Sequence, residues 1–339
     1  MGRRDHRSAA RPLERGTAAA ACRRDAGGAG RADAVVTGGA LVVGEALIDE
    51  VVDGGSVSRH PGGSPANVAL GLARLGVATR LHTAIGDDED GALIRRHLGG
   101  SGVGLTPESV TPAPTSKAVA TLAADGSATY RFALTWAPAP LRDLGSPAVV
   151  HTGSIGAFLE PGAEVALEVV EQGRSQGALV SFDPNIRPSL LPDPGAVREL
   201  HTRLAAAAHL VKLSDEDAGY LYPGTPLEDV LDLLVGAGAG VAAITRGGAG
   251  ALLASGGERL GVDAIRTTVA DTVGAGDTFM AALIWALVFD GPGWDGGPVT
   301  AGRLRAAGET AAHAAAITVS RPGADLPRLA DIRPEGGGR

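Results

Sequence analysis

Residues 271–278 read Asp-Thr-Val-Gly-Ala-Gly-Asp-Thr and run directly into an apolar stretch. A glycine-rich turn at the start of a helix can aim unpaired backbone N–H groups at one point, where the helix dipole also favours a phosphate or an oxyanion. An aspartate at that turn would be repelled by the anion unless it accepts a proton from the attacking nucleophile. We therefore interpret Asp277 as a general base beside an anion site formed by Gly274, Ala275 and Gly276. The alternative is structural: a tight loop followed by an aspartate that favours the first helical turn.

A second glycine-rich motif reads Gly-Gly-Ser-Pro-Ala-Asn over residues 62–67 and precedes an apolar helical pattern. Ser64 is expected to be the N-cap of this helix, and Pro65 is expected at its first position. Neither role explains Asn67, whose amide lies one turn into the helix and can both donate to and accept from sugar hydroxyls. The alternative for Asn67 is a side chain that faces solvent.

The elements that position these motifs can be inferred from short apolar runs that alternate with segments of helical length. This alternation predicts an α/β fold with a mostly parallel central sheet and helices on both of its faces. In such a sheet, ligands bind beyond the carboxyl ends of the strands. We expect buried strands over 40–49, which ends in Asp49, and over 178–183, 209–213 and 240–245, and helices over 65–75, 89–98, 162–176, 195–208 and 226–236.

Two segments, 50–60 and 115–136, lack helical spacing. The second alternates between apolar and polar residues, turns at Asp125-Gly126 and returns with the same alternation, which is typical of a β-hairpin. We expect the two segments to form a small β unit that is separate from the central sheet.

The composition of the 339-residue chain is that of a globular protein, with 44% hydrophobic and 20% charged residues, which is enough to bury a core. The net charge of −8 offers no general attraction for nucleic acid or acidic membranes, so any phosphate site must be local. Cys22 is the only cysteine, which excludes disulfides within the chain and cysteine-rich metal sites. No stretch approaches the length of a membrane span. We expect a cytoplasmic protein that binds neither nucleic acid nor membrane.

The two ends of the chain lack the patterns of a folded core. Residues 1–35 are rich in Arg, Ala and Gly, without periodicity, and residues 331–339 contain a run of glycines. We expect disordered tails at both ends and one folded domain over 36–330. Acidic residues within 1–35 argue against the alternative of a targeting peptide.

Taken together, the motifs at 271–277 and 62–67 resemble the two signature regions of the ribokinase-like (PfkB) family of carbohydrate kinases, and the resemblance covers roughly residues 38–328. It implies a three-layer α/β/α fold, with ATP and Mg²⁺ as cofactors and Asp277 as the base. In this family a small β lid covers the sugar and often forms the dimer contact. A lid over 50–60 and 115–136, and a homodimer through it, are therefore expected. Closure of a lid would exclude water that competes with the sugar hydroxyl for the γ-phosphate.

The resemblance also implies which residues hold the sugar. In the family, residues that match Gly63 and Asn67 contact the sugar, and a strand-end aspartate, here Asp49, accepts hydrogen bonds from its hydroxyls. Ser64 replaces the lysine that is usual in ribokinases, a pattern that is more similar to fructokinases. The stretch Asp-Pro-Asn-Ile-Arg over 183–187 is similar to fructokinases and 2-keto-3-deoxygluconate kinases. The residues expected to contact the substrate are Asp49, Gly63, Asn67, Arg131 in the return strand of the hairpin, Asn185, Arg187 and Asp277.

The nucleotide and cation sites are likewise implied by the resemblance. Asp217 stands where most members carry glutamate, so its link to magnesium is expected to run through water. Asp271, with the loop at 320–324, matches the monovalent-cation site of potassium-activated members. As a bare sequence, the turn at 245–250 is also compatible with a glycine-rich hairpin. The residues expected at ATP are Lys212, Thr245, Gly247, Gly250, Gly274, Gly276 and His313, which stands where many relatives carry asparagine.

The sequence therefore predicts an ATP-dependent sugar kinase that converts fructose to fructose 6-phosphate. The alternatives among enzymes are 2-keto-3-deoxygluconate kinase, ribokinase and nucleoside kinase. Outside enzymes, the alternative is a sugar-sensing protein built on a kinase fold. The sequence contains no Gly-x-x-x-x-Gly-Lys-Ser/Thr motif, which disfavours a Walker-type ATPase.

Overall fold

The computed structural model describes residue 2 and residues 38–122, 128–191 and 193–333. Contacts between residues divide the chain into Met1–Asp33 and a second unit, Ala34–Arg339, and all that follows concerns the second unit. The expected tail over 1–35, apart from residue 2, lies outside the described residues, as do residues 334–339 and the turn at Asp125-Gly126.

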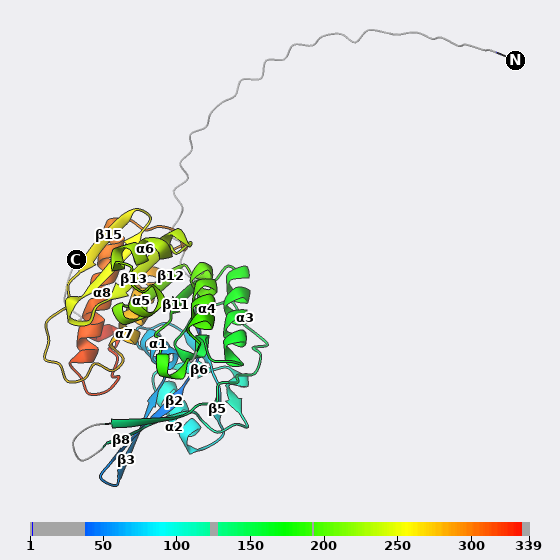
Figure 1. Cartoon of the computed structure of the whole chain (residues 1–339), viewed down its shortest axis with the longest axis vertical. Coiled ribbons are helices and arrows are strands. Elements are labelled where there is room, and N and C mark those ends of the chain that lie inside the picture. The colour runs from blue at the N-terminus through cyan, green and yellow to red at the C-terminus, as the bar shows by residue number, and fades with distance from the viewer. Residues whose placement is uncertain (1, 3–37, 123–127, 192, 334–339) are drawn as a thin grey trace. The chain divides into compact units, whose positions relative to one another are not determined.

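The second unit is built on a nine-stranded sheet (Figure 1). Neighbouring strands from β13 to β6 are parallel, and at the other edge the pairs β13–β14 and β14–β15 are antiparallel. The carboxyl ends of the parallel strands therefore share one edge, where ligands bind in such sheets. In sheet order the strands are β15 (Glu258–Val262), β14 (Ala251–Ser255), β13 (Val241–Thr245), β12 (Leu210–Ser214), β11 (Leu179–Asp183), β10 (Val149–Gly153), β1 (Ala40–Val43), β4 (Thr79–His82) and β6 (Val103–Leu105).

Helices cover both faces of this sheet and bury two separate hydrophobic cores. Along β1 the side chains alternate, so that Val42 enters one core while Leu41 and Val43 enter the other. The three-layer α/β/α fold and its mostly parallel sheet are thus confirmed. The first core contains side chains of α1 (Ser64–Arg74), α2 (Glu89–Gly99), α7 (Ala275–Ile284) and α8 (Ala301–Val319), and the second those of α3 (Gly162–Ser175), α4 (Pro194–Ala207), α5 (Asp215–Leu221) and α6 (Leu227–Gly236).

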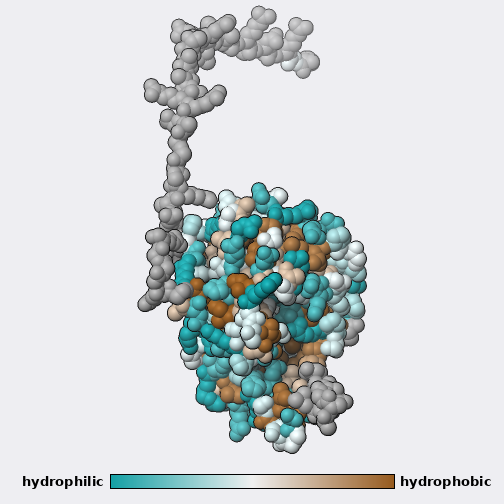
Figure 2. Space-filling model, turned by 90° about the vertical axis from the view of Figure 1, so that its left-hand side faces the viewer, coloured by the Kyte–Doolittle hydropathy of each residue, from teal (hydrophilic) through white to brown (hydrophobic). Residues whose placement is uncertain are grey.

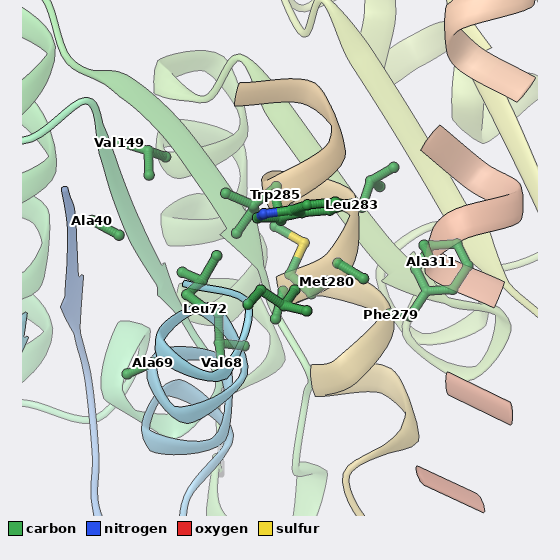
Figure 3. Close-up of a cluster of buried hydrophobic side chains, with 14 of the residues drawn as sticks. Ala40, Val68, Ala69, Leu72, Val149, Phe279, Met280, Leu283, Trp285 and Ala311 are labelled. Carbon is green, nitrogen blue, oxygen red and sulfur yellow. The ribbon is translucent and has the colours of Figure 1, made fainter. Parts of the chain in front are cut away.

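The helices that carry the two glycine-rich motifs, α1 and α7, pack against each other in the first core. In Figure 3, Val68 and Leu72 of α1 face Met280 of α7, while Phe279 extends toward Ala311 of α8. Helix α7 is therefore fixed between α1 and α8, and its amino-terminal turn is held by the packing of the core.

A second sheet of four strands adjoins the central sheet, and we call it the small sheet. Its order is β3-β2-β8-β9, with β2 and β8 parallel and the other pairs antiparallel. Helix α2 packs against β2 and β3. The strands are β3 (Ser56–Gly62), β2 (Leu47–Asp53), β8 (Lys117–Leu122) and β9 (Ala128–Ala133), and a separate two-stranded sheet pairs β5 (Ile85–Gly86) with β7 (Val110–Thr111).

The expectation of one buried strand over 40–49 is wrong. Strand β1 ends at Val43, and β2 begins at Leu47 in the small sheet. The break lies at Gly44, whose φ of 156° is unfavourable for other residues, and a Cβ there would lie 2.3 Å from Cγ of Pro65. Asp49 therefore belongs to the small sheet and does not end a strand of the central sheet.

The fold also continues past residue 330, where the domain was expected to end. Helix α9 (Leu329–Ile332) packs two partly buried side chains against the first core. The guanidinium of Arg333 lies 4.8 Å from the ring centroid of Trp285, in the π-helical turn that follows α7. Among the described residues, no helix is both long and apolar enough to cross a membrane.

Candidate active site

The two glycine-rich motifs meet at the carboxylate of Asp277. Asp277 lies in the first turn of α7 and is only 7% exposed. The Ser64 hydroxyl donates to its Oδ1 over 2.6 Å, and the Asn67 amide donates to its Oδ2 over 2.8 Å. Both donors lie in the first turn of α1, more than 200 residues away in the sequence. Each oxygen of the carboxylate thus has a donor from the opposite helix.

The expectation that Ser64 caps α1 is wrong. Gly63 is the N-cap, with a φ of 104°, and no side chain accepts a capping hydrogen bond there. A Cβ on Gly63 would lie 2.5 Å from the carbonyl oxygen of Glu45, so only glycine fits this bend. Because Ser64 is already inside the helix, its hydroxyl is free to donate to Asp277.

The turn before Asp277 lies close to a buried lysine. Gly274 is the N-cap of α7, and a Cβ on Gly276 would lie 3.1 Å from Nζ of Lys212. Lys212 comes from β12 and donates to Oδ2 of Asp183, the last residue of β11, over 2.9 Å. Both side chains are buried. The ammonium therefore adds positive charge beneath the amino terminus of α7, where the helix dipole already favours an anion.

Electrostatics keep this buried pair ionised at neutral pH. Burial raises the pKa of Asp183 to about 6, although the Lys212 ammonium opposes the rise. Burial lowers the pKa of Lys212, but the carboxylates of Asp183, Asp217 and Asp277 outweigh it, so that pKa is raised overall. Oδ1 of Asp183 is buried without a hydrogen-bond partner in the described part of the chain.

Glu45, a buried carboxyl within electrostatic reach of Asp277, was not singled out from the sequence. Glu45 lies between β1 and β2, is 4% exposed, and its Oε2 accepts a hydrogen bond from Gly156 N over 2.8 Å. Burial raises the pKa of Glu45 to about 7; hydrogen bonds from Ser154 and Gly156 oppose this, and the charge of Asp277 adds to it. β1 adjoins β10 on one side and β4 on the other, so Glu45 follows a strand at which the strand order reverses. An acid directly after such a strand is the signal that could have identified it.

Asp49 and the stretch at 183–187 lie on the same side of the site. Burial raises the pKa of Asp49, and the positive charges of His60 and Arg187 offset part of that rise. Nη1 of Arg187 donates to Oδ1 of Asn185 over 2.7 Å. A Cβ on Gly62 would lie 2.1 Å from Oδ2 of Asp49, so this glycine leaves room for the carboxylate.

The other expected site residues are spread over β13 and the turn that follows it, β9 and α8. Thr245 ends β13 next to Ser214 in the sheet register. Gly247 and Gly250 form the turn into β14, so this segment is the hairpin considered as an alternative, which does not exclude nucleotide binding. Arg131 lies exposed on β9. No hydrogen bond between described residues joins Arg131, Thr245 or His313 to Asp277. His313 lines a cavity of about 240 Å³ together with Trp285, Glu309, Thr310, Ile332 and Arg333.

The two residues expected to bind cations differ in their surroundings. Both oxygens of Asp217 accept backbone hydrogen bonds, Oδ1 from Ile186 over 2.7 Å and Oδ2 from Ser214 over 3.0 Å. Asp271 joins the loop before α7 to the loop after α8, since its oxygens accept from the N–H groups of Val273 and Gly323. These hydrogen bonds hold the pKa of Asp271 below its ordinary value, and the one from Val273 has the largest effect. Within the described ranges, no cluster of three or more His, Cys, Asp or Glu side chains could hold a metal ion.

Comparison with known proteins decides the family. The sequence profile of the pfkB family carbohydrate kinases matches residues 13–331. This chain belongs to the pfkB family. A fructokinase of Rhizobium leguminosarum bv. trifolii is 33% identical over 264 residues, which cover 74% of this chain and 80% of that protein.

Solved structures of sugar kinases share the pfkB fold of this chain. The fructokinase of Xylella fastidiosa with bound ATP matches with a TM-score of 0.74 and 25% identity, over 86% of this chain and 96% of that one. The aminoimidazole riboside kinase of Salmonella enterica, complexed with aminoimidazole riboside and an ATP analog, matches with a TM-score of 0.70 and 26% identity, over 84% and 94% of the two chains. The expectation of a ribokinase-like carbohydrate kinase is therefore confirmed, and this member of the family is a sugar kinase.

Proposed function

We propose that this kinase transfers the γ-phosphoryl group of ATP to the primary hydroxyl of fructose and forms fructose 6-phosphate. The observation that carries the proposal is the Asp277 carboxylate, held by hydrogen bonds from α1 at the glycine-rich start of α7. The choice of fructose is supported by relatives with about one third identity that are fructokinases. The choice of ATP is supported by the related fructokinase structure with bound ATP.

In the proposed reaction Asp277 accepts the proton of the sugar hydroxyl while the hydroxyl oxygen bonds to the γ-phosphorus of ATP. The bond between that phosphorus and the β–γ bridging oxygen breaks, and ADP leaves with the electron pair. The N–H groups at Gly274, Ala275 and Gly276 would stabilise the charge that develops on the transferred group, and the Lys212 ammonium would add to their effect. The protein thus supplies positioning and charge stabilisation.

The sugar is proposed to lie between the central sheet and the small sheet. Asp49 on β2 and Arg187 are close enough for their charges to interact, which supports a common role in holding the sugar. The small sheet is proposed to act as a lid that excludes water from the reaction. The residues proposed to contact the sugar, besides Asp277, are Asp49, Gly63, Asn67, Arg131, Asn185 and Arg187.

The nucleotide is proposed to bind as Mg-ATP along the strand ends on the other side of Asp277. Asp217 is proposed to contact the magnesium through water, and the backbone hydrogen bonds that both of its oxygens accept support this indirect role. A potassium ion is proposed near Asp271. The ionised carboxylate of Asp271 supports this proposal, because it joins the two loops that are expected to hold the ion. The residues proposed at ATP are Lys212, Thr245, Gly247, Gly250, Gly274, Gly276 and His313.

The test is an ADP-release assay with Mg-ATP and potassium across fructose, ribose, 2-keto-3-deoxygluconate, glucose and adenosine. We expect fructose to give the highest kcat/KM. We expect Asp277→Asn to lower kcat by about 10²-fold to 10⁴-fold, because the base is lost, and to leave the Kd for fructose in calorimetry nearly unchanged. Asp232→Asn, which changes an exposed ion pair on α6, is the matched control and should keep the wild-type rate.

Two results would contradict the proposal. A higher kcat/KM with another acceptor would overturn the assignment of fructose as the substrate and leave the proposed kinase reaction in place. A near-normal rate of Asp277→Asn would overturn the assignment of the base.

A further inference from the structure

We propose that Ser64 is a positioning residue for the base: its hydroxyl holds Oδ1 of Asp277, so that Oδ2 is the oxygen that accepts the proton of the sugar. The inference rests on the proposed role of Asp277 and adds a residue that was expected only to cap a helix. The hydrogen bond that carries it is 2.6 Å long and lies in the interior of the site.

The assignment of the two oxygens follows from their different donors. Oδ2 accepts from the amide of Asn67, and Asn67 is proposed to contact the sugar, so the hydroxyl arrives on that side of the carboxylate. Oδ1 accepts from Ser64, whose hydroxyl has a single hydrogen to give. Since the torsion that rotates a carboxylate is broad, two fixed donors on opposite oxygens are an effective way to select one orientation.

The backbone around Ser64 is suited to fix this geometry. Ser64 is the first residue of α1 and is 9% exposed. The preceding Gly63 adopts its positive φ directly against the carbonyl of Glu45, and β3 of the small sheet ends one residue earlier, at Gly62. The hydroxyl is therefore aimed by a rigid helix start, and it sits where the small sheet joins the central one.

The test compares kcat and KM of Ser64→Ala and Ser64→Thr in ADP release, with the preferred sugar and saturating Mg-ATP. For Ser64→Ala we expect kcat to fall by about 10-fold to 100-fold through misorientation of the base, with KM for the sugar changed by less than about threefold. Ser64→Thr keeps a hydroxyl and should restore kcat.

The matched control is Ser255→Ala, which removes another buried serine hydroxyl. Ser255 Oγ donates to Gly240 O and accepts from Val299 N at the opposite end of the central sheet. This variant should lose stability and keep the wild-type kcat and KM.

The outcomes separate this inference from the proposed function. If Asp277→Asn is inactive and Ser64→Ala keeps the wild-type kcat, the role of Ser64 is wrong while the base stands. Equal losses of kcat in Ser64→Ala and Ser64→Thr would make the effect one of packing and would also overturn the inference. An active Asp277→Asn would overturn the base and Ser64 together.

Discussion

At the scale of one residue, the buried carboxyl of Glu45 makes the stability of the fold depend on pH. Its pKa rises from 4.5 to about 7, chiefly through burial. Between these two pH values the folded protein retains a proton that the unfolded chain releases, so the free energy of unfolding falls as pH rises through this window. Above pH 7 the loss of unfolding free energy caused by the buried charge of Glu45 is complete, and below pH 4.5 there is no such loss.

Replacement of Glu45 by Gln removes this ionisation and keeps an oxygen for the N–H of Gly156. We expect Glu45→Gln to be more stable than the wild type by about 3 kcal/mol at pH 8 and nearly equal to it at pH 4.5. Urea unfolding of both proteins at the two pH values measures the difference. Glu199→Gln on the exposed face of α4 is the control and should show no such dependence. A stability difference that is the same at both pH values would contradict the prediction.

At the same scale, the sequence could identify the residues whose roles follow from local pattern. The glycine turn before Asp277 and the amide of Asn67 stand out because both lie in short glycine-rich motifs at the start of a predicted helix. It could not identify the hydrogen bond from Ser64 to Asp277, because the two residues are 213 positions apart and local rules favour a cap at Ser64. Nor could it find the pairing of Lys212 with Asp183, which depends on the register of neighbouring strands.

Between elements, the spacing of α1 and α7 is set by one small contact. A Cβ on Gly71 would lie 2.7 Å from Cβ of Ala281 and 2.8 Å from Cδ2 of Leu326. Gly71 lies one helical turn after Asn67, and Ala281 lies one turn after Asp277. The close approach of the two helices therefore determines whether the amide of Asn67 can reach the carboxylate.

Gly71→Ala is expected to push the two helices apart. Although alanine favours helix by about 1 kcal/mol, overpacking should lower the free energy of unfolding by about 1–3 kcal/mol in total, and kcat should fall at least about tenfold. Urea unfolding and ADP release measure the two effects. Gly302→Ala on α8, where no atom lies within 4 Å, is the matched control: it should be equally or more stable and fully active. A Gly71→Ala protein with wild-type stability and rate would refute the role of this contact.

The elements themselves were predictable where their periodicity is strong. The expected helices over 65–75, 89–98, 162–176, 195–208 and 226–236 correspond to α1, α2, α3, α4 and α6, each shifted by no more than one residue at either end. The prediction of one strand over 40–49 was wrong because no polar residue interrupts the apolar run before Glu45. Only the positive φ of Gly44 and its contact with Pro65 show that the chain leaves one sheet and enters another.

At the scale of the whole molecule, both edge strands of the small sheet carry exposed apolar side chains. Val57 on the edge strand β3 is 55% exposed, and Phe132 on the opposite edge strand β9 is 39% exposed. Figure 2 shows apolar residues in small patches among hydrophilic ones on the visible face. Edge strands with exposed apolar residues are suited to pairing with another chain. We therefore propose that a second copy of the chain covers the small sheet in a homodimer.

The charge of a single residue should decide this association. We expect sedimentation velocity at micromolar concentration to give twice the mass of one chain for the wild type and the mass of one chain for Val57→Asp, because a carboxylate would have to be buried without a partner in the interface. Leu233→Asp is the matched control: Leu233 is 52% exposed on α6, away from the small sheet, so the dimer should persist. A monomeric wild type would show that there is no such interface. A dimer that Leu233→Asp dissociates and Val57→Asp does not would show that the interface lies elsewhere.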